Sequence, residues 1–238
     1  MQEESTTTET VITDEQVQEM ADAGLLFGRK KSRTNPKMKN YIAANRNGFE
    51  MIDLAKTKEM LEKAEEFLKT SAATGKQILI VGTHPASKKV VEEIGKEFSY
   101  PYVSLRWLGG TLTNFDTIQK RLRYYIKLKA DNAAGRLLKY TKKEQIKFVQ
   151  ELERLERLFG GLEKMDQMPI ALLVFGANDH ETAIREANIV KVPVVVVATT
   201  SADPDTIDHI VPANDSSISS VKWLAERFKK AIKSGLKK

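Results

Sequence analysis

The stretch "RWLGGTLTNF", residues 106 to 115, combines residue types that can bind an anion. Arg106 carries a permanent positive charge, and the pair Gly109-Gly110 allows the backbone to turn sharply. Hydroxyl and amide side chains follow, and a basic helical pattern comes directly after them. Glycines followed by hydroxyls at the start of a helix are typical of phosphate sites. The stretch therefore raises the question of which phosphate, if any, it contacts.

Three interpretations of this stretch remain open. In the first, Thr113 or Asn114 caps the following helix, and the glycines only permit the turn before it. In the second, the backbone approaches RNA, Arg106 contacts a phosphate or stacks on a base, and Trp107 is buried behind it. In the third, the loop forms a nucleotide pocket.

Two further segments have residue types that could support catalysis. "LIVGTHPASKK", residues 79–89, has the order strand, loop and helix start, but it lacks both the spaced glycines of a dinucleotide site and the Gly-Lys-Ser/Thr of a P-loop. The segment 201–217 could offer carboxylates to magnesium, although turn and cap chemistry around its two prolines explains them better; these are Asp203, Asp205, Asp208 and Asp215. We expect no catalytic, cofactor or metal site.

Histidine and serine patterns agree with this expectation. The three histidines, His84, His180 and His209, show no metal-ligand spacing, and no serine or threonine stands in a nucleophile elbow. The best enzyme hypothesis is a doubly wound α/β enzyme that acts on a phosphorylated small molecule through residues 82–88 and the aspartates near position 203.

Positive charge is concentrated in separate tracts. The formal net charge is +6, yet residues 1–28 contain seven acids and no basic side chain. The next segment, residues 28–49, has no acid and contains Arg29, Lys30, Lys31, Arg33, Lys37, Lys39 and Arg46. A second basic tract runs from Lys120 to Lys147, and lysines recur at the C-terminus. Such blocks indicate a polyanion-binding surface, although each could be a solvated basic face.

These charges define the candidate RNA-binding residues. The first group comprises the seven cations of residues 28–49. The second group comprises Arg106, Asn114, Lys120, Arg121 and Arg123. We expect residues 28–47 to be a loop that is mobile until RNA neutralises it, because like charges repel and few apolar residues are present to order it.

Bulk composition limits the class of protein. The 238 residues suffice for one large or two small domains, and the absence of cysteine excludes disulfides and thiolate metal sites. No apolar run approaches the roughly 20 residues of a membrane span, and the N-terminus lacks the basic start of a signal peptide. We expect a soluble cytoplasmic protein without membrane contact.

The elements that must position these residues follow from apolar spacing. An acidic N-terminal tail, residues 1–19, is expected to be disordered, although "DEQVQEMADAG" at its end predicts a short helix that stops at Gly24. Asn47-Gly48 predicts a β-hairpin, and Asp53 is expected to cap the next helix. From Gln77 on, continuous apolar strands alternate with helices, which indicates an α/β fold with a parallel sheet covered on both faces.

Residues 114–162 interrupt this alternation. Apolar residues recur there at heptad spacing in two arms: Phe115, Ile118, Leu122 and Tyr125 in the first, and Phe148, Leu152, Leu155, Phe159 and Leu162 in the second. Thr141 and Glu144 form a capping box for the second arm, which Gly160-Gly161 ends. We predict an antiparallel α-helical coiled-coil hairpin inserted into an α/β domain made of residues 20–113 and 163–238.

Four segments resemble the hallmark sequences of one family: "RWLGGTLTNF", "NPKMKNYI", "RNGFEMIDLAKT" and "DPDTIDHIVPAND". Together they resemble the bacterial-type second protein of the small ribosomal subunit, the S-two family, whose segments follow one another along the chain in the same order. The resemblance extends from about Met20 to Ala231 and implies a flavodoxin-like domain with a protruding coiled-coil hairpin. It also implies binding to small-subunit (16S-type) ribosomal RNA, no enzymatic activity, and contact with neighbouring proteins, including the large multi-repeat protein called S-one.

The chain also departs from the family pattern. Where the family commonly has "GVHFGH", this sequence has "GLLFGR", so that Leu26 and Arg29 replace two histidines. Thr199 stands where the family has an aspartate after the last strand. Our interpretation is a structural, RNA-binding constituent of the small ribosomal subunit without a cofactor. The enzyme described above and a hairpin adaptor that binds only proteins are the alternatives.

Overall fold

The computed structural model describes residues 14–236, so the part of the predicted tail at residues 1–13 lies outside the described residues. The helices are α1 (Asp14–Asp22), α2 (Leu54–Ala73), α3 (Pro85–Phe98), α4 (Phe115–Ala133), α5 (Lys142–Phe159), α6 (Glu181–Val190) and α7 (Ile218–Leu236). The strands are β1 (Phe27–Lys30), β2 (Ile42–Arg46), β3 (Phe49–Ile52), β4 (Ile78–Val81), β5 (Tyr102–Val103), β6 (Ala171–Phe175), β7 (Val194–Ala198) and β8 (His209–Pro212). Short 3₁₀ helices include η1 (Lys31–Arg33), η2 (Pro36–Tyr41), η3 (Arg136–Lys139), η4 (Gly160–Leu162), η5 (Asn178–His180) and η6 (Pro204–Thr206).

The main sheet has five parallel strands in the order β5-β4-β6-β7-β8. This order is that of a flavodoxin-like doubly wound sheet, so the predicted fold class is confirmed. Two of its strands were not predicted. β5 has only two residues, and β8 lies within the segment 201–217, whose aspartates and prolines were expected to form turns and caps.

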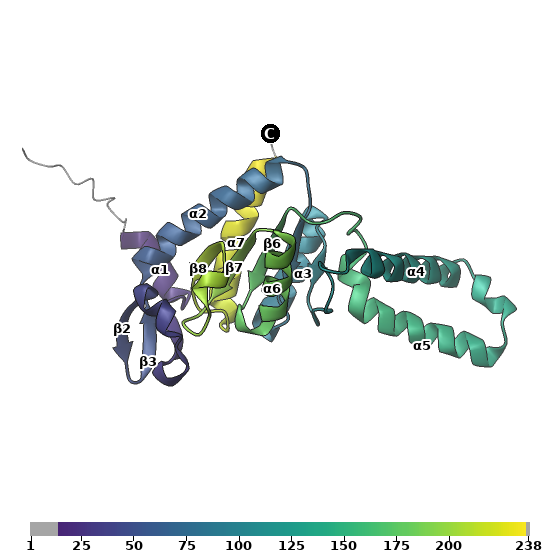
Figure 1. Cartoon of the computed structure of the whole chain (residues 1–238), viewed down its shortest axis with the longest axis horizontal. Coiled ribbons are helices and arrows are strands. Elements are labelled where there is room, and N and C mark those ends of the chain that lie inside the picture. The colour runs from purple at the N-terminus through teal and green to yellow at the C-terminus, as the bar shows by residue number, and fades with distance from the viewer. Residues whose placement is uncertain (1–13, 237–238) are drawn as a thin grey trace, which may run out of the picture.

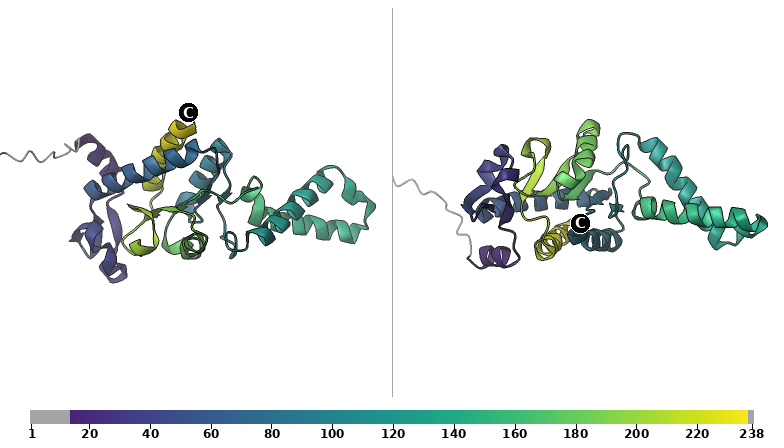
Figure 2. Two further views of the ribbon diagram at one scale, coloured as in Figure 1. Left: turned by 45° about the horizontal axis from the view of Figure 1, so that its top comes forward. Right: turned by 90° about the horizontal axis from the view of Figure 1, so that it is seen from below.

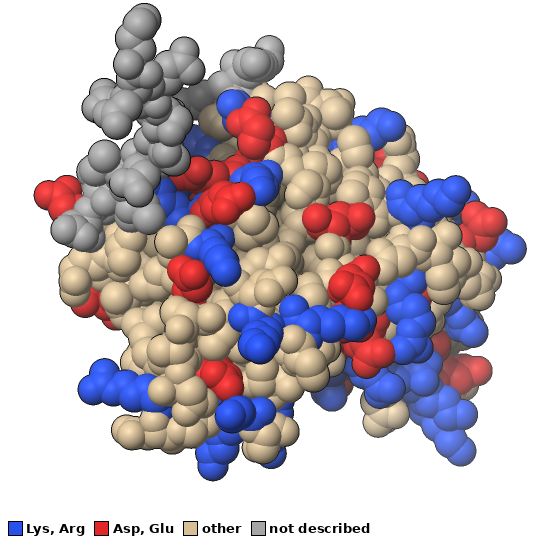
Figure 3. Space-filling model, turned by 60° about the vertical axis from the view of Figure 1, so that its left-hand side comes forward, with Lys and Arg blue, Asp and Glu red and all other residues tan. Residues whose placement is uncertain are grey.

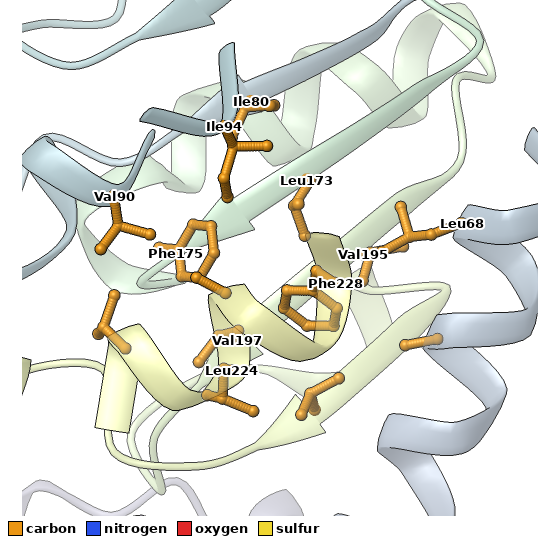
Figure 4. Close-up of a cluster of buried hydrophobic side chains, with 14 of the residues drawn as sticks. Leu68, Ile80, Val90, Ile94, Leu173, Phe175, Val195, Val197, Leu224 and Phe228 are labelled. Carbon is orange, nitrogen blue, oxygen red and sulfur yellow. The ribbon is translucent and has the colours of Figure 1, made fainter. Parts of the chain in front are cut away.

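Both faces of this sheet are buried, which explains its continuous apolar strands. Alternate residues of β4, β6 and β7 face opposite layers. One set packs with helices α2, α3 and α7, as Figure 4 shows for Leu173, Phe175 and Phe228. The other set packs with α6 and with the bases of α4 and α5. The core is therefore divided into two layers by the sheet, as expected when helices cover both faces.

A second, three-stranded antiparallel sheet has the order β1-β3-β2. The predicted hairpin is confirmed, because β2 and β3 are joined by Asn47 and Gly48, which have φ values of 52° and 80°. These two left-handed residues form the tight turn that Asn-Gly favours. The N-cap of α2 is confirmed too, since the Asp53 carboxylate accepts hydrogen bonds from the N–H groups of Ala55 and Lys56.

Helices α4 and α5 leave the edge of the main sheet beside β5 and form an antiparallel pair that projects from the body (Figures 1 and 2). Leu122, Tyr125, Leu155 and Phe159 are buried between the base of this pair and the sheet. The Glu144 carboxylate accepts hydrogen bonds from the N–H and hydroxyl of Thr141, so the predicted cap of α5 is present. A coiled-coil winding of the pair and its separation as a domain stay predictions.

Candidate nucleic-acid interface

The loop at residues 106–114 encloses an anion, and that anion is the carboxylate of Glu186 from α6. One of its oxygens accepts hydrogen bonds from the Trp107 indole at 3.0 Å and the Gly110 N–H at 2.8 Å. The other accepts from the Leu112 N–H at 3.0 Å and from the N–H and hydroxyl of Thr113, both at 3.3 Å. The glycine turn does build an anion cradle, but the protein fills it with its own side chain.

The electrostatics of Glu186 support this description. The residue is only 6% exposed, and burial alone would raise the pKa of its carboxyl. The hydrogen bonds from Trp107, Gly110, Leu112 and Thr113 outweigh burial, and they hold the pKa of Glu186 below its ordinary value. Glu186 is therefore a buried anion at neutral pH, and the donors of the loop are already occupied.

Two predicted details of this loop are wrong. Asn114 is the N-cap residue of α4, but neither it nor Thr113 caps the helix with its side chain, because the Thr113 hydroxyl points to Glu186 instead. Trp107 is half-buried rather than buried, with its indole N–H on the same carboxylate. Arg106, at the start of the loop, is exposed, so its charge remains available for the predicted contact with RNA.

The crevice where a doubly wound fold binds nucleotides is occupied by protein atoms. In this strand order the connections reverse direction between β4 and β6, and ligands bind at the carboxyl ends of such a strand pair. There the buried His180 ring accepts a hydrogen bond from the Thr83 N–H at 3.1 Å through Nε2, and its Nδ1 lies 2.7 Å from the carbonyl of Gly176. Burial lowers the pKa of His180, so the ring is neutral and bridges the two strand ends.

The start of α3 beside this crevice is satisfied as well. His84 is its N-cap, and the His84 Nδ1 accepts a hydrogen bond from the Ala86 N–H at 3.3 Å. The N–H groups of Ser87 and Lys88 donate to the His84 carbonyl. Since the amide groups that would hold a phosphate are used internally, residues 82–88 offer no prepared nucleotide site.

The aspartates near position 203 serve turns and ion pairs. Asp203 accepts a hydrogen bond from the Asp205 N–H at the start of η6, and Asp208 accepts one from the Val194 N–H at 2.9 Å. Asp215 is 7% exposed, and burial raises the pKa of its carboxyl although Ser216 and Arg29 act in the opposite direction. Within residues 14–236 no three His, Cys, Asp or Glu side chains are grouped as metal ligands would be.

The first group of predicted RNA-binding residues lies on the three-stranded sheet and on η1 and η2. Two of its members are paired inside the protein. Arg29 contacts Asp215 at 3.1 Å, and Lys37 contacts Asp203 at 3.0 Å and Asp205 at 2.6 Å. The other five are exposed and have no ion pair among the described residues: Lys30, Lys31, Arg33, Lys39 and Arg46. These five are the cations best placed for phosphate.

The expectation of an open loop at residues 28–47 is wrong. The segment forms β1, η1, η2 and β2, and Met38 inserts into the core with 0% exposure. The Asn35 N–H donates to the Thr200 carbonyl, and the Asn35 side chain caps η2. Sequence reasoning counted the repelling charges but missed the aspartates from residues 203–215 that offset two of them.

The second group lies on the loop before α4 and on the exposed side of that helix. Arg106, Asn114, Lys120, Arg121 and Arg123 are all exposed. Arg123 donates a hydrogen bond to Gln119 one turn earlier. The two groups lie on separate parts of the molecule: the first on the β1–β3 sheet at one end of the long axis in Figure 1, the second at the base of the helix pair, beside the main sheet. In Figure 3 blue side chains gather along the lower part of the face that bears the small sheet, while red and blue alternate above.

Comparison with known proteins decides the family. The model of the family described as Ribosomal protein S2 matches residues 20–235, nearly the whole chain. The chain belongs to the ribosomal protein S2 family. The resemblance read from the four sequence segments is thereby confirmed, and both basic groups lie inside the matched S2 region.

Individual S2 relatives agree over most of their length. "Small ribosomal subunit protein uS2" of Roseiflexus castenholzii is 41% identical over 216 residues, which are 91% of this chain and 82% of the relative. The protein of the same name from Coprothermobacter proteolyticus is 39% identical over 219 residues, 92% of this chain and 82% of the relative. Among the described residues of this S2 chain, no helix has the length and apolar character that crossing a bilayer requires.

Proposed function

We propose that the chain is a structural constituent of the small ribosomal subunit and binds small-subunit ribosomal RNA through its two basic groups. The observation that carries this proposal is the S2 family match over residues 20–235. The exposed cations of the two groups add a physical mechanism, since Lys and Arg bind RNA mainly through phosphates. Its place of action is then the ribosome in the cytoplasm.

RNA recognition in this proposal depends on shape and charge. A-form RNA hides its base edges in a deep, narrow groove that side chains cannot read, so contacts to paired regions are made to phosphates and sugars. Two basic groups on separate parts of one folded chain fit such binding, because the spacing between the groups selects for the fold of the RNA rather than for its sequence.

Neighbouring ribosomal proteins are proposed partners, including the multi-repeat protein S-one that the family resemblance implies. Exposed apolar side chains on α5 and on its connection to α4 support a protein contact there: Leu138 of η3 is 75% exposed and Ile146 of α5 is 59% exposed. Apolar side chains exposed in one region of a surface can mark a binding site.

The proposed role requires no enzymatic activity. The carboxyl ends of β4 and β6, where a doubly wound enzyme would bind its phosphorylated substrate, are bridged by the neutral His180 ring. The aspartates near position 203 are engaged with Lys37 and with backbone N–H groups. The alternative enzyme hypothesis is therefore not retained.

The test measures binding to 16S-type RNA at several salt concentrations. Each lost phosphate contact should lower the slope of log affinity against log salt by about 0.7 to 0.9. Replacing Lys30, Lys31 and Arg33 together by alanine should thus flatten the slope by about two units. Replacing Lys37 alone should change the slope by less than the loss of one phosphate contact does, since two aspartates already neutralise that lysine.

The matched control removes three exposed lysines from another region of the molecule, Lys76, Lys89 and Lys96. This triple alanine variant has the same net charge as the first one, and its slope should stay near that of the wild type. Equal slopes for the two variants would show that the first group does not face RNA. Failure of the wild-type protein to co-sediment with small subunits would refute the proposed function itself.

A further inference from the structure

A hollow of about 400 Å³ lies between the three-stranded sheet and the loops that follow β7 and β8. From the small sheet and η1 it is lined by Phe27, Gly28, Arg29, Lys30, Arg33 and Phe49. From the loops it is lined by Thr199, Asn214 and Ser216. Aromatic, cationic and hydroxyl or amide side chains thus share one small site, which is separate from the crevice at the ends of β4 and β6.

Two exposed phenylalanines are the unusual feature of this hollow. Phe27 is 52% exposed and Phe49 is 44% exposed, whereas the apolar side chain of Met38, between them in the sequence, is fully buried. The Lys30 ammonium lies 5.7 Å from the centroid of the Phe49 ring, a cation–π distance. Exposed aromatic rings interleaved with cations are the arrangement that binds unpaired bases, because every base has a flat face that can stack on a ring.

The positions of these side chains are fixed by close packing behind them. A Cβ atom on Gly28 would lie 2.7 Å from both the Glu50 carbonyl oxygen and the Thr200 Cγ2, so only glycine permits this approach of β1. The Arg29 N–H donates to the Thr200 hydroxyl at 2.9 Å, and one end of its guanidinium is held by Asp215. Arg29 is therefore oriented before any ligand arrives, and its other guanidinium N–H groups have no hydrogen-bond acceptor among residues 14–236.

We propose that this hollow binds one unpaired nucleotide of RNA, with its base stacked on Phe27 or Phe49 and its phosphate held by Lys30 and Arg33. This inference rests on the proposed function and deepens it by naming a site for a single nucleotide. A base pair in a duplex has both of its faces covered by neighbouring pairs, so it cannot stack on a protein ring. The site therefore selects a bulged or looped nucleotide, unlike the phosphate contacts of the exposed lysines.

Ultraviolet cross-linking tests the contact directly. Full-length protein bound to its cognate 16S rRNA is irradiated and digested, and mass spectrometry locates nucleotide adducts on peptides. The expected result is a single-nucleotide adduct on Phe27 or Phe49, which the double change Phe27→Leu and Phe49→Leu abolishes. The double change to tyrosine keeps the rings and should retain an adduct.

Affinity for the same RNA gives an independent readout. Loss of stacking should weaken binding by about 5- to 100-fold in the leucine variant, while the salt slope remains that of the wild type because no cation is removed. Tyrosine at both positions should restore the affinity. Ile189→Ala, which removes an apolar side chain that is 66% exposed on α6, should bind as the wild type does.

The outcomes separate this inference from the proposed function. If the wild type binds RNA with the expected salt slope and the leucine variant binds equally well without any adduct at these rings, the nucleotide site is refuted and the function stands. If the leucine variant binds RNA normally but the small subunits that contain it lack a neighbouring protein, the hollow takes a protein side chain and the inference is wrong. If the wild type does not bind RNA at all, the proposed function fails first.

Discussion

Glu186 allows the sharpest test of the loop at residues 106–114. Its carboxylate accepts all five hydrogen bonds that the loop directs to it, from Trp107, Gly110, Leu112 and Thr113. Glu186→Ala leaves these donors without an acceptor. The Leu112 N–H is buried, while water can reach part of the others. Breaking such a buried charged network costs about 3 to 5 kcal/mol of the free energy of unfolding.

Glu186→Gln is the finer perturbation. The amide keeps the shape of the side chain and one oxygen acceptor. Its NH₂ group replaces the other oxygen, and it cannot accept hydrogen bonds from the donors on that side of the loop. Losing hydrogen bonds to a charged group should cost about 2 kcal/mol. The control is Glu181→Gln on the same helix, where an exposed carboxylate pairs with Arg185 and where we expect about 0.5 kcal/mol or less. Urea unfolding followed by circular dichroism gives all three values from the midpoint at constant slope.

The difference should also depend on pH. Since the pKa of Glu186 is lower in the folded state than its ordinary 4.5, the folded state prefers the carboxylate. Its stabilising contribution is present at neutral pH and is lost as the pH falls from about 4.5 through the folded value. The gap between wild type and Glu186→Gln should therefore be constant from pH 8 to 5 and shrink below about pH 4.5.

The reasoning would be refuted by a cost for Glu186→Ala that is as small as that of the Glu181 control. The loop would then be held by other contacts, and its donors would be available for phosphate. In that case Glu186→Gln, which removes a negative charge from the cradle, would strengthen RNA binding instead of leaving it unchanged.

Three further outcomes are expected. Leu155→Ala, at a position 3% exposed, should lower the free energy of unfolding by about 2 to 5 kcal/mol, and Leu152→Ala, at a half-buried position, should lower it by less. Leu138→Ala, at a position 75% exposed, should change it by at most about 0.5 kcal/mol. Equal costs for all three changes would exclude the packing described for the helix pair. The NMR titration midpoint of His180 should lie below 6.5, so the folded state resists protonation and unfolding becomes easier as the pH falls below that value; a midpoint at or above 6.5 would show that the ring is not shielded. Calorimetry with ATP or NAD should show no one-to-one complex tighter than micromolar, and such a complex would mean that the crevice opens.

Much of the fold was predictable because its signals are local. Asn47-Gly48 specifies a hairpin turn by backbone conformation alone, and Asp53 announces a helix start by its position. The long apolar runs of β4, β6 and β7 reflect burial on two faces. The missed strands are the ones without such signals: β5 has two residues, β1 contains two cations, and β8 is flanked by acids and ends in proline.

The site was harder to predict because its decisive partners are far away in the sequence. Glu186 is separated by more than 70 residues from the loop that it fills, and Asp215 by 186 residues from Arg29. One signal could have been used for Glu186, since it is a lone acid on the apolar side of α6 together with Ala183 and Ala187. No comparable local signal marks Phe27 and Phe49, which lie together only because β1 pairs with β3.

The position of the two basic groups on separate parts of the molecule, the small sheet and the base of the helix pair, affects how an RNA-bound molecule would leave. When one basic group dissociates, the other keeps the molecule on the RNA, so the released group rebinds at a high effective concentration. Complete dissociation requires both basic groups to be unbound at the same moment, which makes the residence time far longer than either contact alone would give. A polyanion that binds the released group during partial dissociation prevents its rebinding. Exchange of the protein on the RNA would therefore accelerate with competitor concentration, even though no contact of the bound state is weakened.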